Sequence, residues 1–185
     1  MRLFDHLRGK AKTSNPEQAA EELFAYSRSD LNAEMLPEHG FRCRPSINAN
    51  FKFTKTAIII QWLRKMERHP AAHIAATAVL EQFERITFSG FEPETAGSLV
   101  VQLKRLMELT DAINELMAGK VVPEGETVKA GLSIAKRWFE TALGDEQLST
   151  RATVMHGPEM IHIIHEEMKK IGGMVGIAVF GGGTL

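Results

Sequence analysis

The sequence predicts an all-α fold: a single-domain bundle of five to six helices, with at most a minor two-stranded β element. Three observations lead to this prediction. Apolar residues recur at helical spacing in several long segments. Proline and glycine separate those segments at regular intervals. The chain has 185 residues, of which 44% are hydrophobic and 24% charged, which is enough for one core without disulfide or metal support.

Residues 53–69 are expected to form the central helix of this bundle. They make up the most apolar helix-like run in the chain, and the apolar side chains follow the i, i+3, i+4, i+7 spacing of one helical face. That face is wide, so a single neighbouring helix cannot cover it. The stripe consists of Ile59, Trp62, Leu63 and Met66, widened by Ala57, Ile58 and Ile60.

Turn and capping residues place the other predicted helices. Ser14 lies three residues before Glu17 and Pro16 suits a first helical turn, so a helix is predicted from there to Ser27. Proline or glycine marks most further boundaries. The remaining predicted helices cover residues 70–88, 93–118, 127–143 and 157–171, and shorter or irregular helical pieces are predicted over 30–36 and 146–155.

Two segments have strand-like patterns. Ile47, Ala49, Phe51 and Phe53 alternate with polar residues, and this period of two is typical of a strand. A lone strand needs a partner, and the comparable segment is the apolar run near the end of the chain. Residues 46–53 and 177–180 are therefore predicted to pair in a small sheet.

Composition divides the chain into a basic amphipathic segment over 1–13, the helical domain over 14–171 and an apolar, glycine-rich tail over 172–185. The first segment is interpreted either as an anchor for a partner or an anionic membrane, or as a turn packed on the body. The tail carries no charge and is too short to span a bilayer. It is expected to dock on the body or on another chain, through Met174, Val175, Ile177, Val179 and Phe180.

Positive charge is concentrated between residues 41 and 69, although the net charge of the whole chain is −1. Such a cluster predicts a surface for an acidic protein or a nucleic acid, with Phe51 or Phe53 stacking on bases in the second case. A net charge near zero favours the protein partner. The residues of this basic set are Arg42, Arg44, Lys52, Lys55, Arg64, Lys65 and Arg68, and Phe51 belongs to the same candidate site.

Candidate chemistry is confined to one histidine-rich helix and one cysteine. Glu159 and His162 have the Glu-x-x-His spacing of di-iron bundles, but the apolar arc of that helix directs His162 toward water. Cys43 lies between two arginines, which favours the thiolate, yet no histidine is tied to it by spacing. We therefore predict no catalytic residue, no metal and no cofactor.

The function predicted from these patterns is a non-catalytic protein-interaction or assembly subunit, which docks through the basic face and the apolar tail. The alternative is a small nucleic-acid-binding subunit that uses the basic set. A metal-dependent enzyme built on Glu159, His162, His165 and Glu166 is the third hypothesis. The single cysteine and the absence of an apolar leader-like segment predict a cytoplasmic protein without a membrane span, with self-association or a protein partner.

Overall fold

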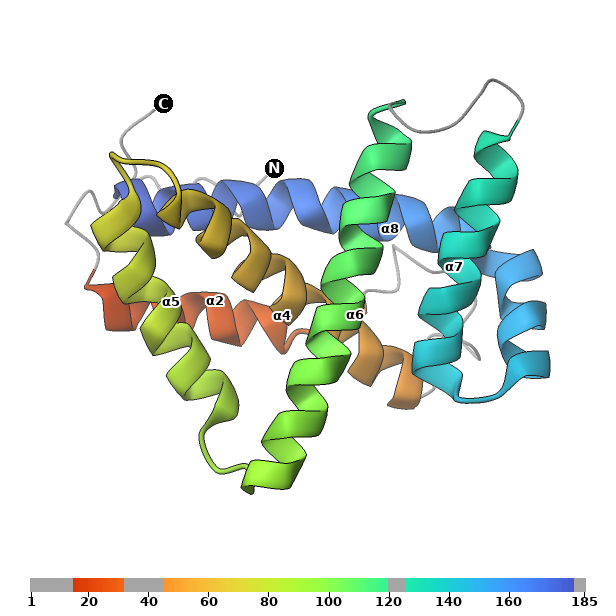
Figure 1. Ribbon diagram of the computed structural model, residues 1–185, viewed down its shortest axis with the longest axis horizontal. Helices are drawn as coiled ribbons and strands as arrows, with labels where there is room; N and C mark the ends of the chain where they lie inside the picture. The colour runs from red at the N-terminus through yellow and green to blue at the C-terminus, as the bar shows by residue number, and fades with distance from the viewer. Residues whose placement is uncertain (1–14, 32–44, 120–125, 182–185) are drawn as a thin grey trace.

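The computed structural model describes residues 15–31, 45–119 and 126–181, and all regular secondary structure within them is helical (Figure 1). This confirms the predicted all-α class and the predicted number of helices. The six described helices are α2 (Pro16–Ser27), α4 (Pro45–Glu67), α5 (His73–Phe88), α6 (Pro93–Met117), α7 (Thr127–Leu143) and α8 (Glu146–Phe180).

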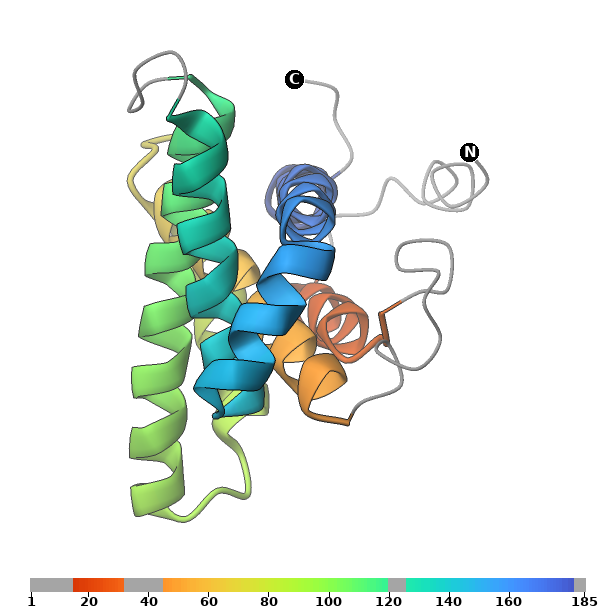
Figure 2. The ribbon, with the colours of Figure 1, turned by 90° about the vertical axis from the view of Figure 1, so that its right-hand side faces the viewer.

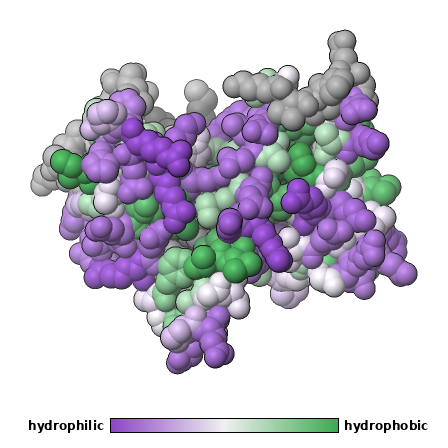
Figure 3. Space-filling model, viewed as in Figure 1, coloured by the Kyte–Doolittle hydropathy of each residue, from purple (hydrophilic) through white to green (hydrophobic). Residues whose placement is uncertain are grey.

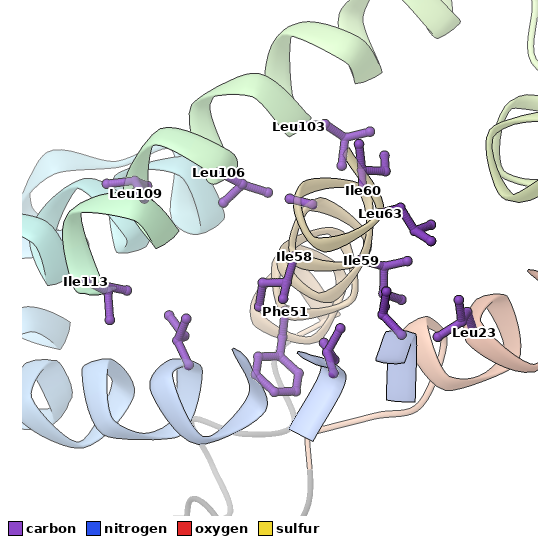
Figure 4. Close-up of a cluster of buried hydrophobic side chains, with 14 of the residues drawn as sticks. Leu23, Phe51, Ile58, Ile59, Ile60, Leu63, Leu103, Leu106, Leu109 and Ile113 are labelled. Carbon is purple, nitrogen blue, oxygen red and sulfur yellow. The ribbon is translucent and has the colours of Figure 1, made fainter. Parts of the chain in front are cut away.

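Helix α4 is the centre of the bundle and packs against each of the other five described helices. Its side chains fill the core between α6, α8 and α2 (Figure 4). Ile60 faces Leu103 of α6, and Ile59 lies beside Leu23 of α2. The helix predicted over residues 53–69 is therefore central, as expected, although it begins eight residues earlier, at Pro45, and ends at Glu67.

Helix α8 extends along the length of the molecule and contacts α7 at one end and α2 and α5 at the other (Figure 1). It has 35 residues, and Pro158 lies inside it. Proline removes one helical hydrogen bond and bends a helix, and the first turns of α8 run at an angle to the rest (Figure 2). No helix among the described residues is both long and apolar enough to cross a membrane.

The predicted strand pairing is wrong. Residues 46–53 lie in the first turns of α4, and 177–180 form the last turn of α8. The buried side chains Ile47, Asn50, Phe51 and Thr54 follow the helical spacing i, i+3, i+4, i+7. Two of them are polar, so the apolar residues alone show a false period of two.

The predicted end of the last helix at Ile171 is also wrong, because α8 continues to Phe180 without interruption at Pro158 or at residue 172. Glycine at position 172 lets α8 pack closely against Trp62 of α4. Any other residue would place a Cβ atom 2.8 Å from the Trp62 ring. Elsewhere, α7 has the predicted bounds and α5 begins three residues late, at His73. The predicted segments 1–13 and 30–36 lie wholly or mostly outside the described residues.

Candidate interaction surfaces

The structure distributes the basic set over several intramolecular contacts. Arg64 pairs with Glu84 of α5, with 3.1 Å between Nη2 and Oε1. The ammonium of Lys65 lies 4.8 Å from the centre of the Trp62 ring. Arg68 is exposed, and Phe51 is buried in the core, where it cannot stack on a base. Arg42, Arg44 and Cys43 lie outside the described residues.

Three polar side chains of α4 hold the segment that follows α2, and we call them the α2 clamp: Asn48, Lys52 and Lys55. Their i, i+4, i+7 spacing places them on one side of the helix. Asn48 Oδ1 accepts a hydrogen bond of 2.9 Å from the backbone N–H of Leu31. Lys52 Nζ lies 2.7 Å from Asp30 Oδ1, and this contact holds the pKa of Asp30 below its usual range.

Lys55 is the buried member of the α2 clamp, with 1% of its surface exposed. Its ammonium donates to the carbonyl oxygens of Tyr26 (3.1 Å) and Ser29 and to Ser29 Oγ (2.6 Å). These groups lie at the C-terminal end of α2, where backbone carbonyls lack helical partners and attract cations. Burial lowers the pKa of Lys55 to about 8, and the negative charge of Glu167 partly counteracts this effect.

Half-buried Tyr26 and buried Glu167 form a hydrogen-bonded pair beside Lys55. The Tyr26 hydroxyl donates to Glu167 Oε2 over 2.6 Å, which joins α2 to α8. Burial raises the pKa of Tyr26, and the bond to Glu167 raises it further. The ammonium of Lys170 lies 4.8 Å from the centre of the Tyr26 ring. Buried groups with shifted pKa values also occur at catalytic sites; here Lys55 binds oxygen atoms at the end of α2, and Tyr26 binds Glu167.

Replacing Tyr26 with phenylalanine is expected to lower the free energy of unfolding by about 1–3 kcal/mol, because Glu167 remains buried and loses its hydroxyl donor. Urea denaturation of the variant and of the wild type measures the difference. Tyr26→Phe in a Glu167→Gln background is the control, and there it should cost less, since no buried carboxylate is left without its donor. Equal costs in the two backgrounds would contradict a specific Tyr26–Glu167 bond.

The tail residues pack along the body as the last turns of α8. Val175 and Val179 are buried, so these two serve the fold of this chain. Met174, Ile177 and Phe180 are half-buried and keep part of their surface accessible. The predicted assembly residues thus divide into two groups, and only the second can contact another molecule without unfolding α8.

The histidine-rich turns of α8 do not converge with other ligands. Glu159, His162 and Glu166 are exposed, and Glu166 pairs with Lys169 at 2.8 Å, which lowers the pKa of that carboxyl. Among residues 15–31, 45–119 and 126–181, no three His, Cys, Asp or Glu side chains are grouped so that they could hold a metal ion.

The first turns of α8 expose their larger apolar side chains. Asp145 caps this end through a bond of 2.7 Å from the N–H of Leu148 to its Oδ1. Val154 is 75% exposed, Met155 53% and Leu148 42%, and we call these three side chains the α8 outer face. Val154 and Met155 line a shallow hollow of about 500 Å³, together with Glu146, Gln147, Thr150 and Arg151.

The inner side of the same turns is small or polar: Ser149, Ala152, Thr153 and Gly157 are buried. Small residues let α7 approach closely, since a Cβ atom at Gly157 would lie 3.2 Å from Ala135 and Leu132. The sequence pattern of residues 146–155 predicted a short or irregular helical piece, so this surface was not among the predicted sites. The seven-residue spacing of Leu148 and Met155, opposite the small residues, is the pattern that identifies it.

Other exposed apolar side chains lie on separate elements. Phe91, Val100 and Val101 belong to the α5–α6 turn and the start of α6, which project from the body (Figure 1). The apolar surface in Figure 3 is divided into small patches by hydrophilic side chains. Single exposed apolar residues are common on soluble proteins.

The chain matches no protein-family model, and no curated protein or solved structure is significantly similar to it. Its own geometry therefore has to support any functional proposal.

Proposed function

We propose that this chain is a non-catalytic protein-interaction or assembly subunit, with the α8 outer face as its main contact surface. One observation carries the proposal. In the first turns of α8 the larger apolar side chains point outward beside charged and polar residues, and the buried side consists mainly of small residues. A helix that served only the fold of its own chain would have the opposite arrangement.

The chemistry around the α8 outer face fits a protein partner. Contact surfaces are enriched in methionine and arginine and have a polar rim around an apolar centre. Here Val154 and Met155 form the apolar part, and Arg151, Glu146 and Gln147 surround them. The hollow between these residues gives a partner side chain a place to enter.

The surfaces predicted from the sequence supply secondary contacts in this proposal. Met174, Ile177 and Phe180 keep part of their surface accessible on the last turns of α8. Arg64, Lys65 and Arg68 are exposed at the end of α4 and suit an acidic rim on the partner. The single cysteine, Cys43, is compatible with the reducing environment of the cytoplasm, which we propose as the location.

Size-exclusion chromatography with light scattering tests the proposal in its assembly form. The full-length protein is expected to have a mass that is a multiple of 20.6 kDa at both low and high salt, because an apolar contact is not screened by ions. The double substitution Val154→Asp, Met155→Asp is expected to return the mass to that of one chain.

The matched control is Ile74→Asp, since Ile74 is 84% exposed on α5 and lies outside the proposed surface. This control should keep the assembled mass. A wild-type protein that has the mass of one chain at every concentration would contradict assembly. A double variant with the wild-type mass would exclude the α8 outer face as the contact.

A further inference from the structure

Helix α2 docks through few large apolar side chains: Leu23 is buried, and Phe24 packs edge to face on Phe83 of α5, with 6.5 Å between the ring centres. Only four of its 12 residues are buried, and three of those are small: Ala19, Ala20 and Ser27. Leu23 is the one large buried side chain. Apolar area removed from water sets most of the free energy of docking, and the polar contacts at the C-terminal end of α2 add to it.

The polar contacts of α2 centre on the buried ammonium of Lys55. Its three hydrogen bonds all go to oxygen atoms of residues 26–29. Within the part of the chain that the structure describes, Lys55 forms no salt bridge with a carboxylate. If α2 detaches, Lys55 loses these three acceptors and its ammonium becomes hydrated.

We propose that α2 is a proton-linked latch: it docks more tightly when Lys55 loses its proton, and uptake of that proton favours its release from α4, α5 and α8. The geometry supports this because docking takes an ammonium out of water and gives it carbonyl and hydroxyl oxygens in place of a salt bridge. A neutral amine can donate to the two carbonyl oxygens and accept a hydrogen bond from the Ser29 hydroxyl, without the cost of a buried charge.

The charges around Lys55 do not reverse the lowering of its pKa by burial. Lys170 of α8 and Lys52 of α4 lower the pKa of Lys55, while Glu167 of α8 and Asp30, which follows α2, raise it less than burial lowers it. Tyr26 remains neutral when α2 is docked because its pKa is raised. With a pKa of about 8 when docked and 10.5 when exposed, Lys55 holds fewer protons in the docked state between these two values.

The sign of the pH dependence follows from that difference. Docking strengthens as the pH rises through the window between the two pKa values, and well below the lower value both states are protonated and docking no longer depends on pH. Between pH 7 and pH 9 the equilibrium constant for docking is expected to rise roughly tenfold. At neutral pH the equilibrium constant for docking of α2 is therefore close to its lowest value.

Thiol labelling in the native full-length chain tests the latch. The probe is Ser27→Cys in a Cys43→Ser background, because Ser27 is fully buried on α2. Labelling by a disulfide reagent then requires α2 to open, and division by the rate for an unfolded peptide removes the ionisation of the thiol itself. The control probe is Ser149→Cys, which is equally buried in the first turns of α8.

The expected result is that Cys at position 27 labels faster than Cys at position 149, and that its opening constant falls about tenfold from pH 7 to pH 9. In a Lys55→Met background the opening constant should not change over that range. Equal opening constants at the two probes would show that α2 unfolds with the whole domain and would overturn the latch. A pH-independent opening constant with Lys55 present would overturn the proton linkage, and this comparison does not require that Lys55→Met folds.

Discussion

Replacing Trp138 with alanine is expected to lower the free energy of unfolding by about 3–5 kcal/mol. The indole is fully buried on α7 and packs edge to face against Phe139, with 5.2 Å between the ring centres. Its Nε1 donates to Thr54 Oγ1 of α4 over 2.9 Å. The substitution leaves a cavity between two helices and removes the donor to a buried hydroxyl, so both effects add.

Urea denaturation followed by circular dichroism measures this change. Trp138→Phe is the matched variant, because it keeps most of the packing and removes only the N–H donor, and it is expected to cost about 1 kcal/mol. Similar losses for both variants would indicate that the hydrogen bond dominates. A loss below 1 kcal/mol for Trp138→Ala would contradict the buried position of this side chain.

The two neighbouring glycines of α8 are expected to respond to alanine with opposite signs. A Cβ atom at Gly172 would lie 2.8 Å from two ring atoms of Trp62, whose Nε1 donates to the carbonyl of Met168 on the same helix. The indole must therefore move, and Gly172→Ala is expected to destabilise the fold by about 1–3 kcal/mol. Because residue 172 is glycine, this part of α8 can pack closely against the Trp62 ring.

Gly173→Ala is the matched control, since a Cβ atom there meets nothing within 4 Å. Alanine favours a helix over glycine by about 0.8–1.0 kcal/mol, so this variant is expected to gain stability. The midpoints of thermal unfolding, measured side by side, decide the sign of each change. Destabilisation by both variants to the same extent would contradict the specific contact between Gly172 and Trp62.

The sequence predicted the helices well wherever apolar spacing and terminal residues agree. Helix α7 has the predicted bounds because its apolar stripe ends directly before Gly144, which has a left-handed backbone with a φ of 64°. The same agreement identified α6, where Pro93 occupies the first turn. In both helices the local chemistry and the long-range packing favour the same boundary.

The start of α4 was mispredicted because its core is partly polar. Asn50 donates to the carbonyl of Trp138 at 3.3 Å, and Thr54 accepts from the indole of the same residue. These partners lie more than eighty positions away in the sequence, so local spacing could not identify Asn50 and Thr54 as buried. If these two polar residues are left out, the apolar residues of the segment show the period of two that is typical of a strand.

The candidate surfaces were predictable only in part. Lys55 has the same local pattern as an exposed cation, and only the end of α2, brought to it by the fold, explains its burial. Val154 and Met155 carried a detectable pattern, but Pro158 indicated a helix start and so separated these residues from α8. Proline inside a helix is tolerated when packing on both sides holds the helix together.

The bond between Tyr26 and Glu167 also constrains how this protein is made, because it joins residues that are 141 positions apart. A ribosome synthesises α2 before the other described helices, yet α8, the last of them in the chain, supplies contacts that complete its docking. Domains tend to fold as their N-terminal parts appear, and contacts between distant residues form slowly. The nascent chain therefore has to carry α2 without these partners until α8 has been synthesised, and the docking of α2 is complete only then.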